Sequence, residues 1–197
     1  DQFDEDDQRL LEVLAGHASV ALVNARLYEA ERREANRAKA LLELSRELSS
    51  GTQLDDVGGR IAAGGARILG VERTSVWLPE SDRAGSDIIC RGSWSAPGVT
   101  GSAGVGDRLP SAVAATFSRR PDPFVITAAE YESVVAKHFP GVLAAAYAVV
   151  PIHLAVGWGA ITFALDGAES LDDRQLELLN AVAGQAKLAL TNALSFE

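Results

Sequence analysis

The residue types that most often carry catalysis or metal binding are sparse in this sequence and are not spaced for either role. The three histidines, His17, His138 and His153, show neither HxxxH nor HExxH spacing, and the single cysteine, Cys90, leaves no second thiolate for a zinc site. No GxSxG nucleophile elbow occurs, so the triad of a serine hydrolase is not indicated. We therefore expect no catalytic centre and no metal site.

Cys90 lies in an apolar run, Ile88-Ile89-Cys90, and Arg91 follows it. Turnover through a disulfide needs a resolving thiol, which this chain lacks. A lone thiol also means that the chain forms no internal disulfide, which suits a reducing compartment such as the cytosol. We predict that Cys90 is buried and chemically inert.

The glycine-rich stretch at residues 98–106 invites comparison with a phosphate-binding loop. Gly101 and Gly106 have the outer spacing of GxxxxGK[ST], but Asp107 and Arg108 stand where the lysine and the hydroxyl residue are required. A carboxylate at that place would repel a phosphate, so we expect a surface loop. The net charge of −9 also argues against a nucleic-acid partner, because a phosphate backbone is bound by a basic surface.

A set of aromatic side chains suits a different chemistry, that of an apolar ligand pocket. For any one of them simple core packing is the commoner role. Alternation along residues 144–153 (AAAYAVVPIH) places Tyr147, Val149 and His153 on one face of a strand, where they would border such a pocket. The aromatic set comprises Trp77, Trp94, Phe117, Phe124, Tyr131, Phe139, Tyr147 and Trp158.

The hydrophobic pattern predicts the elements that position these side chains. A first helix from Asp4 to Ser49 contains no proline and one glycine, and Asp4 is its predicted N-cap. A second helix at about 54–69 contains four glycines, which we expect to pack closely against a neighbour, since each costs roughly 1 kcal/mol relative to alanine. Segments in which apolar and polar residues alternate follow, together with short helices, and this order of elements indicates an α+β fold. Strands are expected at about 74–78, 87–94, 124–127, 143–153 and 157–165, short helices at about 111–118 and 129–139, and a closing helix from Asp172, with Gln175 completing its capping box.

The first helix and the closing helix are related in sequence. Eleven of the 27 positions from Phe3 to Glu29 are identical to the residue 168 positions later, where about two would match by chance. Convergence of two Ala/Leu-rich amphipathic helices is the alternative. We interpret the N-terminal copy as the closing helix of a preceding domain. The absence of methionine likewise indicates a segment of a longer protein.

Residues 149–165 (VVPIHLAVGWGAITFAL) and 170–193 (SLDDRQLELLNAVAGQAKLALTNA) together resemble a GAF domain, a small sensor module of signalling proteins. Such domains carry a proline-centred strand, a tight turn, a glycine-containing strand and an acidic-capped Leu/Ala helix ending near an asparagine. The resemblance implies a GAF-like antiparallel sheet flanked by helices and preceded by a long N-terminal linker helix. It assigns residues 35–197 to a GAF domain and residues 1–34 to the terminal helix of a preceding GAF-like domain and its linker.

The same resemblance implies a non-catalytic sensory module of a multidomain, bacterial-type signalling protein, which binds a small ligand or mediates dimerisation and relays a signal through its flanking helices. No cofactor is expected. A redox or gas sensor loaded with haem or another cofactor such as flavin is one alternative, with His138 or His153 on a haem iron, and bilin attachment would have to use Cys90. A degenerate GAF domain that acts only as a dimerisation spacer is the other. The asparagine-lysine, phenylalanine and aspartate-glutamate signature of cyclic-nucleotide-binding GAF domains is missing. The candidate pocket residues are Trp94, Phe117, Phe124, Tyr131, His138, Tyr147, Val149 and His153.

The N-terminal helix carries an apolar stripe, and burial of such a stripe favours a homodimer with two-fold symmetry. The output domain is expected elsewhere in the full-length chain. A cytoplasmic location is expected, because the longest strongly apolar run, VLAAAYAVVP, is about half as long as a membrane span. The candidate dimer residues are Leu11, Leu14, Ala18, Ala21, Ala25, Leu41 and Leu48.

Overall fold

The computed structural model divides into two compact units, residues 1–40 and residues 41–197. The boundary predicted between residues 34 and 35 lies six residues before the boundary between these two units. The assignment of the first 34 residues to a preceding domain stays a prediction. The residues that the structure describes are 4–48, 51, 53–83, 85–139, 142, 146–165 and 170–195.

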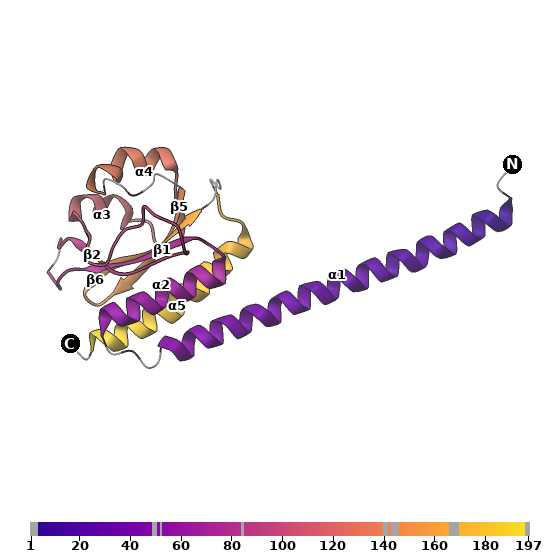
Figure 1. Ribbon diagram of the computed structural model, residues 1–197, viewed down its shortest axis with the longest axis horizontal. Helices are drawn as coiled ribbons and strands as arrows, with labels where there is room; N and C mark the ends of the chain where they lie inside the picture. Colours follow the sequence, from indigo (N-terminus) through magenta and orange to yellow (C-terminus); the bar gives the residue numbers. More distant parts are fainter. Residues whose placement is uncertain are drawn as a thin grey trace. The chain divides into compact units, whose positions relative to one another are not determined.

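Helix α1 spans Glu5–Leu48 (Figure 1). Asp4 caps it as predicted, because its Oδ1 accepts hydrogen bonds from the backbone N–H groups of Asp6 and Asp7 at 3.0 and 2.9 Å. Most side chains of the first unit are exposed. Among the described residues, one helix is long and apolar enough to cross a membrane by length and composition alone, and it lies within α1. Core helices of soluble proteins and signal sequences also pass that test.

The second unit is built on a six-stranded sheet in the order β3-β2-β1-β6-β5-β4, and each described strand pair is antiparallel. The short strand β3 was not predicted from the sequence, whereas the other five strands fall where the period-two pattern placed them. The strands are β1 (Arg73–Pro79), β2 (Ile88–Ser95), β3 (Arg108–Leu109), β4 (Phe124–Ile126), β5 (Ala146–Leu154) and β6 (Gly157–Leu165).

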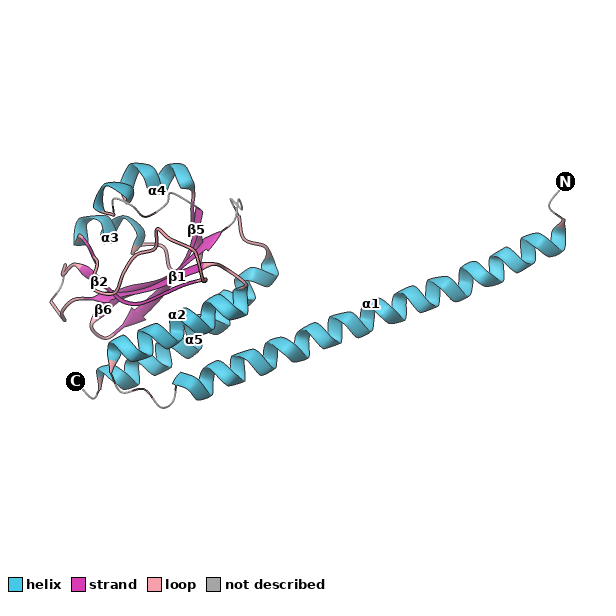
Figure 2. Cartoon of the chain, in the orientation of Figure 1, coloured by secondary structure: helices cyan, strands magenta, loops and turns pink. Residues whose placement is uncertain are grey.

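Helices cover both faces of this sheet (Figure 2). Helices α2 (Leu54–Leu69) and α5 (Asp173–Leu194) pack side by side against one face. On the other face lie α3 (Ser111–Phe117), α4 (Ala128–Val134) and the 3-10 turn η1 (Ala136–His138). The predicted α+β fold, with flanking helices and a long N-terminal helix, is confirmed.

Two separate cores follow from this layering, one on each side of the sheet. The core under α2 and α5 contains alternate residues of β1, Val76 and Leu78, together with Phe163 of β6. The core under α3 and α4 contains the intervening β1 residue, Trp77, and Phe139, whose ring centroid lies 5.4 Å from that of Trp77. Strand β1 therefore presents alternate side chains to α2 and α5 on one face and to α3 and α4 on the other.

The last two turns of α1 belong to the core of the second unit. Leu44 is fully buried and Leu48 is 4% exposed, while Leu41 packs against the same cluster. The burial of Leu48 within its own domain argues against the predicted dimer contact at that residue. A dimer contact of Leu41, which is half-buried, stays a prediction.

The glycines of α2 bring this helix against the sheet. A Cβ atom on Gly58 would lie 2.6 Å from the carbonyl oxygen of Arg91, and a Cβ atom on Gly92 would lie 2.0 Å from the carbonyl carbon of Gly58. A Cβ atom on Gly64 or Gly65 would likewise lie closer than 3.0 Å to the side chain of Leu44 or of Phe163, respectively. The expectation of close packing is correct for these three helical glycines. It is wrong for Gly59, whose Cβ would meet no heavy atom within 4 Å.

Candidate functional site

A cavity of about 80 Å³ lies between the sheet and the smaller helices α3 and α4. Its walls come from all six strands of the sheet, from α3 and α4, and from the loop that carries Ser102 and Ala103. The aromatic lining residues are Trp77, Phe117, Tyr131, Phe139, Tyr147 and Trp158.

The strand register makes the floor of this cavity polar at one end and apolar at the other. Ser75 pairs with Thr162, and Thr162 in turn pairs with Val149, so these three form one row across the sheet. Two residues further along β1, Trp77 pairs with Ala160 and forms an apolar row. Arg73 lies two residues before Ser75, at the polar end.

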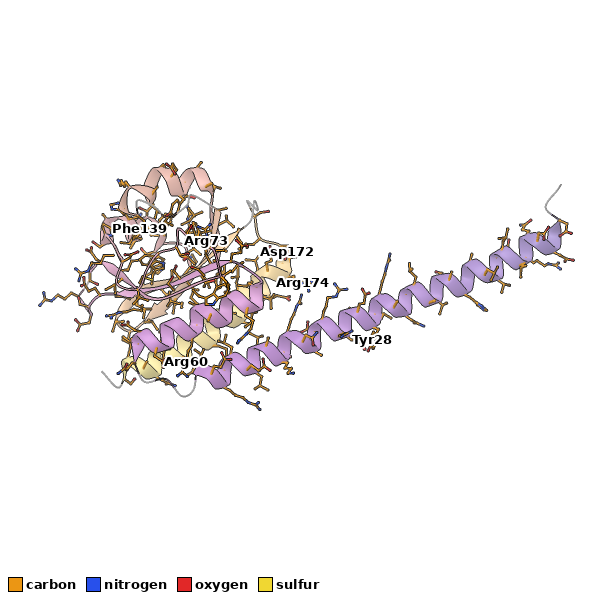
Figure 3. All side chains as sticks on the ribbon, viewed as in Figure 1. Tyr28, Arg60, Arg73, Phe139, Asp172 and Arg174 are labelled. Atoms are coloured by element: carbon orange, nitrogen blue, oxygen red, sulfur yellow. The ribbon has the colours of Figure 1, made fainter. Side chains whose placement is uncertain are left out.

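Arg73 is the charged residue that lines the cavity, and it is half-buried (Figure 3). Its Nη1 donates a hydrogen bond to the carbonyl oxygen of Gly101 at 3.1 Å. None of the described residues that line the cavity is an aspartate or a glutamate. Among the residues that the structure describes, no carboxylate forms an ion pair with Arg73. Within the part of the chain that the structure describes, the polar end of the cavity therefore carries a positive charge without a carboxylate partner.

Two tyrosines stand beside this charge. The rings of Tyr131 and Tyr147 are tilted against each other with their centroids 5.1 Å apart. Burial raises the pKa of both hydroxyls, and the positive charge of Arg73 opposes this rise in each case. Both phenols are therefore neutral at physiological pH.

Residues 53–190 match the family described as GAF domain. The chain belongs to the GAF domain family. A GAF domain is a regulatory sensory module of signalling proteins, and such modules are generally non-catalytic. The match begins just before α2 and ends within α5, so it includes both layers of helices and the cavity between the sheet and α3 and α4.

Known proteins that are similar to this GAF domain come from several signalling systems. A dual cyclic-AMP and cyclic-GMP phosphodiesterase 11A of Takifugu rubripes is 35% identical over 79 residues, which are 40% of this chain and 9% of that protein. This chain thus spans about a tenth of that relative's length.

Several solved structures share the fold of this GAF domain at low sequence identity. The GAF domain of an Acinetobacter phosphoenolpyruvate-protein phosphotransferase superposes with a TM-score of 0.61 at 14% identity, covering 81% of this chain and 95% of that one. The phycoerythrobilin-bound GAF domain of a cyanobacterial phytochrome gives 0.61 at 11% identity, covering 81% and 96%. Residues 122–287 of a methyl-accepting chemotaxis protein give 0.58 at 16% identity, covering 80% and 99%.

A haem or a bilin does not fit this cavity. Pockets that enclose molecules of drug size measure roughly 300–1,000 Å³, several times the volume found here. Neither His138 nor His153 lines the cavity, and Cys90 does not line it either. Among the described residues, no group of three or more histidine, cysteine, aspartate or glutamate side chains is placed to hold a metal ion.

Cys90 is fully buried on the cavity side of the sheet, within the core under α3 and α4. Its Sγ donates a hydrogen bond to the carbonyl oxygen of Gly92 at 3.3 Å. Burial raises the pKa of the Cys90 thiol to about 12, so the reactive thiolate is not populated at neutral pH. The predicted burial is confirmed, and the raised pKa favours the inert role that we predicted for this thiol.

Four of the eight predicted pocket residues meet around the cavity: Phe117, Tyr131, Tyr147 and Val149. Their role in binding a ligand stays a prediction. Alternation along β5 correctly put Tyr147 and Val149 on the face opposite the helical core. His153 follows the same alternation, but it pairs with Trp158 at the far end of β5, where it is exposed and does not line the cavity.

The other three predicted residues also lie outside the cavity lining. Trp94 packs against the core under α2 and α5, because a register shift between β1 and β2 turns it to the helical face. Phe124 lies behind Phe117, with ring centroids 6.0 Å apart, and the guanidinium of Arg120 covers it. His138 is half-buried in η1, and its buried Nε2 finds no hydrogen-bond partner among the described residues.

Sequence reasoning missed the polar residues of the site. Arg73, Ser75 and Thr162 all line the cavity, yet each is of a type that also fits an exposed strand face. One signal was available, because Arg73, Ser75 and Trp77 alternate with Thr74, Val76 and Leu78 along β1. The residues facing the same way as Trp77 were therefore candidates for the same pocket.

Proposed function

We propose that this GAF domain is a non-catalytic sensory module that binds a small ligand in the cavity and relays occupancy through its flanking helices. The observation that carries the proposal is the cavity itself. It is built from the face of the sheet that α2 and α5 do not cover, it is lined by aromatic side chains, and it has a polar end. Pockets that combine an apolar lining with a few convergent polar groups are typical of ligand sites.

Strand β1 offers a physical connection between the cavity and the helices. Ser75 and Trp77 line the cavity, whereas the residue between them, Val76, is fully buried under α2 and α5. A ligand that shifts Trp77 therefore also shifts β1 and the strand paired with it, β2, whose Gly92 lies in close backbone approach to Gly58 of α2. Such a ligand changes the balance between two states only if it binds them with different affinity.

Mass spectrometry of the freshly purified protein tests the binding function. The protein is analysed once under native conditions and once after denaturation, and any small molecule released is identified. We expect a bound small molecule in a measurable fraction of the protein, or a thermal stabilisation when a metabolite library is screened. A protein that carries no molecule and is stabilised by none of the library would contradict the sensory function.

We further propose that the chain forms a homodimer through the apolar stripe of α1, which consists of Leu11, Leu14, Ala18, Ala21 and Ala25. All five side chains are exposed in the single chain. At the positions aligned with them, α5 buries Leu179, Val182, Ala186, Ala189 and Ala193 against its own domain. Residues 1–34 would, on this proposal, close a preceding GAF-like domain or pair with a second copy of themselves.

Light scattering tests the dimer with two matched substitutions. Leu14→Glu places a charge on the stripe, and we expect it to weaken association sharply. Val20→Glu is the control, because at 100° per residue Val20 lies on the opposite side of the helix and is similarly exposed. Removal of residues 1–34 should have the same effect as Leu14→Glu. A monomeric parent protein, or equal effects of the two substitutions, would refute the assignment.

In the full-length protein we propose that an output domain receives the relayed change and that the module works in the cytoplasm, as part of a bacterial-type signalling protein. The polar residues that interrupt the apolar part of α1, among them Glu12, His17, Asn24 and Arg26, support a helix in water rather than a helix that spans a membrane.

A further inference from the structure

A second hollow lies next to the cavity and shares part of its wall. It is a groove of about 270 Å³ between α3, the end of β1 and the turn that joins β5 to β6. The groove reaches the surface, because the exposed residues Ala115 and Gly157 line it. Ile88 and Trp158 line both the cavity and the groove, so these two side chains form the wall that separates the two hollows.

Of these two wall residues, Trp158 is the less restrained. Ile88 is 4% exposed and pairs with neighbours on both sides of β2, whereas Trp158 is half-buried at the turn end of β6. Among the described residues, the Trp158 ring has no aromatic partner and its buried Nε1 finds no hydrogen-bond partner. The other aromatic residues of the cavity lining are each held in a ring pair: Trp77 with Phe139, Tyr131 with Tyr147, and Phe117 with Phe124.

A rotation of the Trp158 side chain joins the two hollows. The apolar contacts of the indole with the core under α3 and α4 oppose this rotation. A buried N–H group without a partner favours it, because an indole turned into the groove can donate to water. A ligand that fills the vacated space replaces the lost apolar contacts, so it stabilises the open state by binding it preferentially.

The joined space has the size of a two-ring compound. The cavity of about 80 Å³ and the groove of about 270 Å³ together give about 350 Å³, at the lower end of the range for pockets that enclose small molecules. A cavity of about 150 Å³ holds benzene, so about 350 Å³ corresponds to roughly 14 carbon-sized atoms. The cavity alone is too small for a single ring, and a tetrapyrrole is too large even for the joined space.

The lining of the joined space favours a flat ring. An indole that turns outward leaves a slot with the outline of a two-ring aromatic, and Trp77 and Phe117 line the cavity beyond that slot. Aromatic rings attract one another in offset and edge-to-face arrangements, which adds to the gain from burial. On the groove side, Ala114 and Ala115 of α3 have side chains too small to fill the space.

Resting on the ligand-binding function proposed above, we propose that the ligand site of this domain is the cavity joined to the groove, that Trp158 is the gate between them, and that the site takes a two-ring aromatic compound. The ligand enters from the groove and occupies the position that the Trp158 side chain leaves.

2-Naphthol is the probe, because it is flat, uncharged at neutral pH and small enough for the joined space. Decahydro-2-naphthol is the control, since it has the same skeleton of heavy atoms but puckered, saturated rings. We expect the intact chain to bind 2-naphthol about fivefold or more tightly than decahydro-2-naphthol, because only the flat compound gains ring contacts.

NMR of the intact chain with ¹⁵N-labelled tryptophan locates the bound probe. The chain has three tryptophans, and Trp158→Phe assigns the indole N–H signal of the gate. We expect 2-naphthol to shift the signal of Trp158. The signal of Trp94 should stay in place, because that residue packs in the core on the opposite face of the sheet.

Two substitutions on α3 test the route through the groove. Ala115→Phe and Ala112→Phe make the same change at exposed positions of one helix, but Ala115 lines the groove and Ala112 does not. The added ring at Ala115 fills the groove and holds Trp158 in its closed position. We expect Ala115→Phe to weaken 2-naphthol about tenfold or more and Ala112→Phe to change its affinity less than twofold, with thermal denaturation as the check that both variants fold.

Four results would each overturn the gated site: no binding of 2-naphthol, equal affinity for its saturated analogue, no shift of the Trp158 signal on binding, or equal effects of the two substitutions. The first two need the parent chain alone, so they decide the proposal even if Ala115→Phe does not fold. The sensory function survives all four results if native mass spectrometry or the library screen finds a different ligand. It fails only if those two measurements also find none, so the two failures are distinguishable.

Discussion

Two neighbouring glycines of α2 give the sharpest test of how this domain is packed. Gly58 faces the sheet, and a Cβ atom there would lie 2.6 Å from the carbonyl oxygen of Arg91 and 2.8 Å from its carbon. Gly59 faces open space, with nothing within 4 Å of the added atom. The substitutions Gly58→Ala and Gly59→Ala therefore make the same chemical change in the same helix and differ in what the methyl group meets.

The magnitudes follow from the geometry. Both substitutions gain up to about 1 kcal/mol from the higher helix propensity of alanine. For Gly58→Ala, moving from 2.6 Å to ordinary contact at 3.4 Å requires a displacement of 0.8 Å between two backbones. Helix α2 would have to move away from the sheet, which loosens the buried side chains of Val57 and Ile61. Such overpacking costs typically 1–3 kcal/mol, about 2 kcal/mol in the middle of the range, so the net effect is destabilising.

Gly92→Ala reports the same contact from the other side. Its Cβ would lie 2.0 Å from the carbonyl carbon of Gly58, and a residue in a strand gains no helix propensity. We therefore expect stability to rise in the order Gly92→Ala, Gly58→Ala, parent protein, Gly59→Ala.

Urea denaturation followed by circular dichroism measures this order, with the m-value checked for two-state behaviour. Thermal denaturation followed by the same signal gives Tm, and for a domain of this size 1 kcal/mol corresponds to a change in Tm of about 2–4 °C. We expect Gly59→Ala to raise Tm by up to about that amount and Gly58→Ala to lower it. If Gly58→Ala proved as stable as Gly59→Ala, the close approach of α2 to β2 would not exist.

Two further predictions concern buried side chains. Because the pKa of the Cys90 thiol is raised from 9.0 to about 12, the unfolded chain ionises first as pH rises. The domain should therefore lose stability between about pH 9 and pH 12, and Cys90→Ala should lose less in urea denaturation at neutral and alkaline pH. An identical pH dependence in the two proteins would contradict this. Leu44 is fully buried, whereas its neighbour Leu42 is 52% exposed. Leu44→Ala should cost about 2–5 kcal/mol and Leu42→Ala less than about 0.5 kcal/mol in the same assay, so equal costs would show that the end of α1 does not pack in the core.

The sequence alone determined the fold family and most of its elements, because these depend on local signals. The spacing of hydrophobic residues along the chain identified the helices and the longer strands. Residues that favour the N-cap position located the starts of the first and the last helix. The side chain of Asp172 accepts a hydrogen bond from the backbone of Gln175, and the side chain of Gln175 accepts one from the backbone of Asp172, as the capping box predicted.

The faces of β2 were decided by strand pairing. A strict period of two puts Cys90 and Trp94 on the same face, yet Cys90 lies in the core under α3 and α4 and Trp94 packs under α2 and α5. The register between β1 and β2 shifts after Val76, so that Gly92 pairs with Val76 and Cys90 with Trp77. Arg91, between them, has no partner on β1 and is therefore an extra residue in β2. One extra residue reverses which face of the sheet the following side chains of that strand point to.

The polar end of the cavity was likewise decided by tertiary structure. From the sequence, Arg73 at the first position of β1 would be predicted to lie on the surface, and so would Ser75 two positions later. Antiparallel pairing with β6 sets Ser75 beside Thr162, and pairing of β6 with β5 sets Ala164 beside Tyr147. The tyrosine and the arginine are 74 positions apart in the chain and line one cavity because β6 lies between their strands. Such a site depends on which strands become neighbours, and that choice is made by the burial of the whole core rather than by any local pattern.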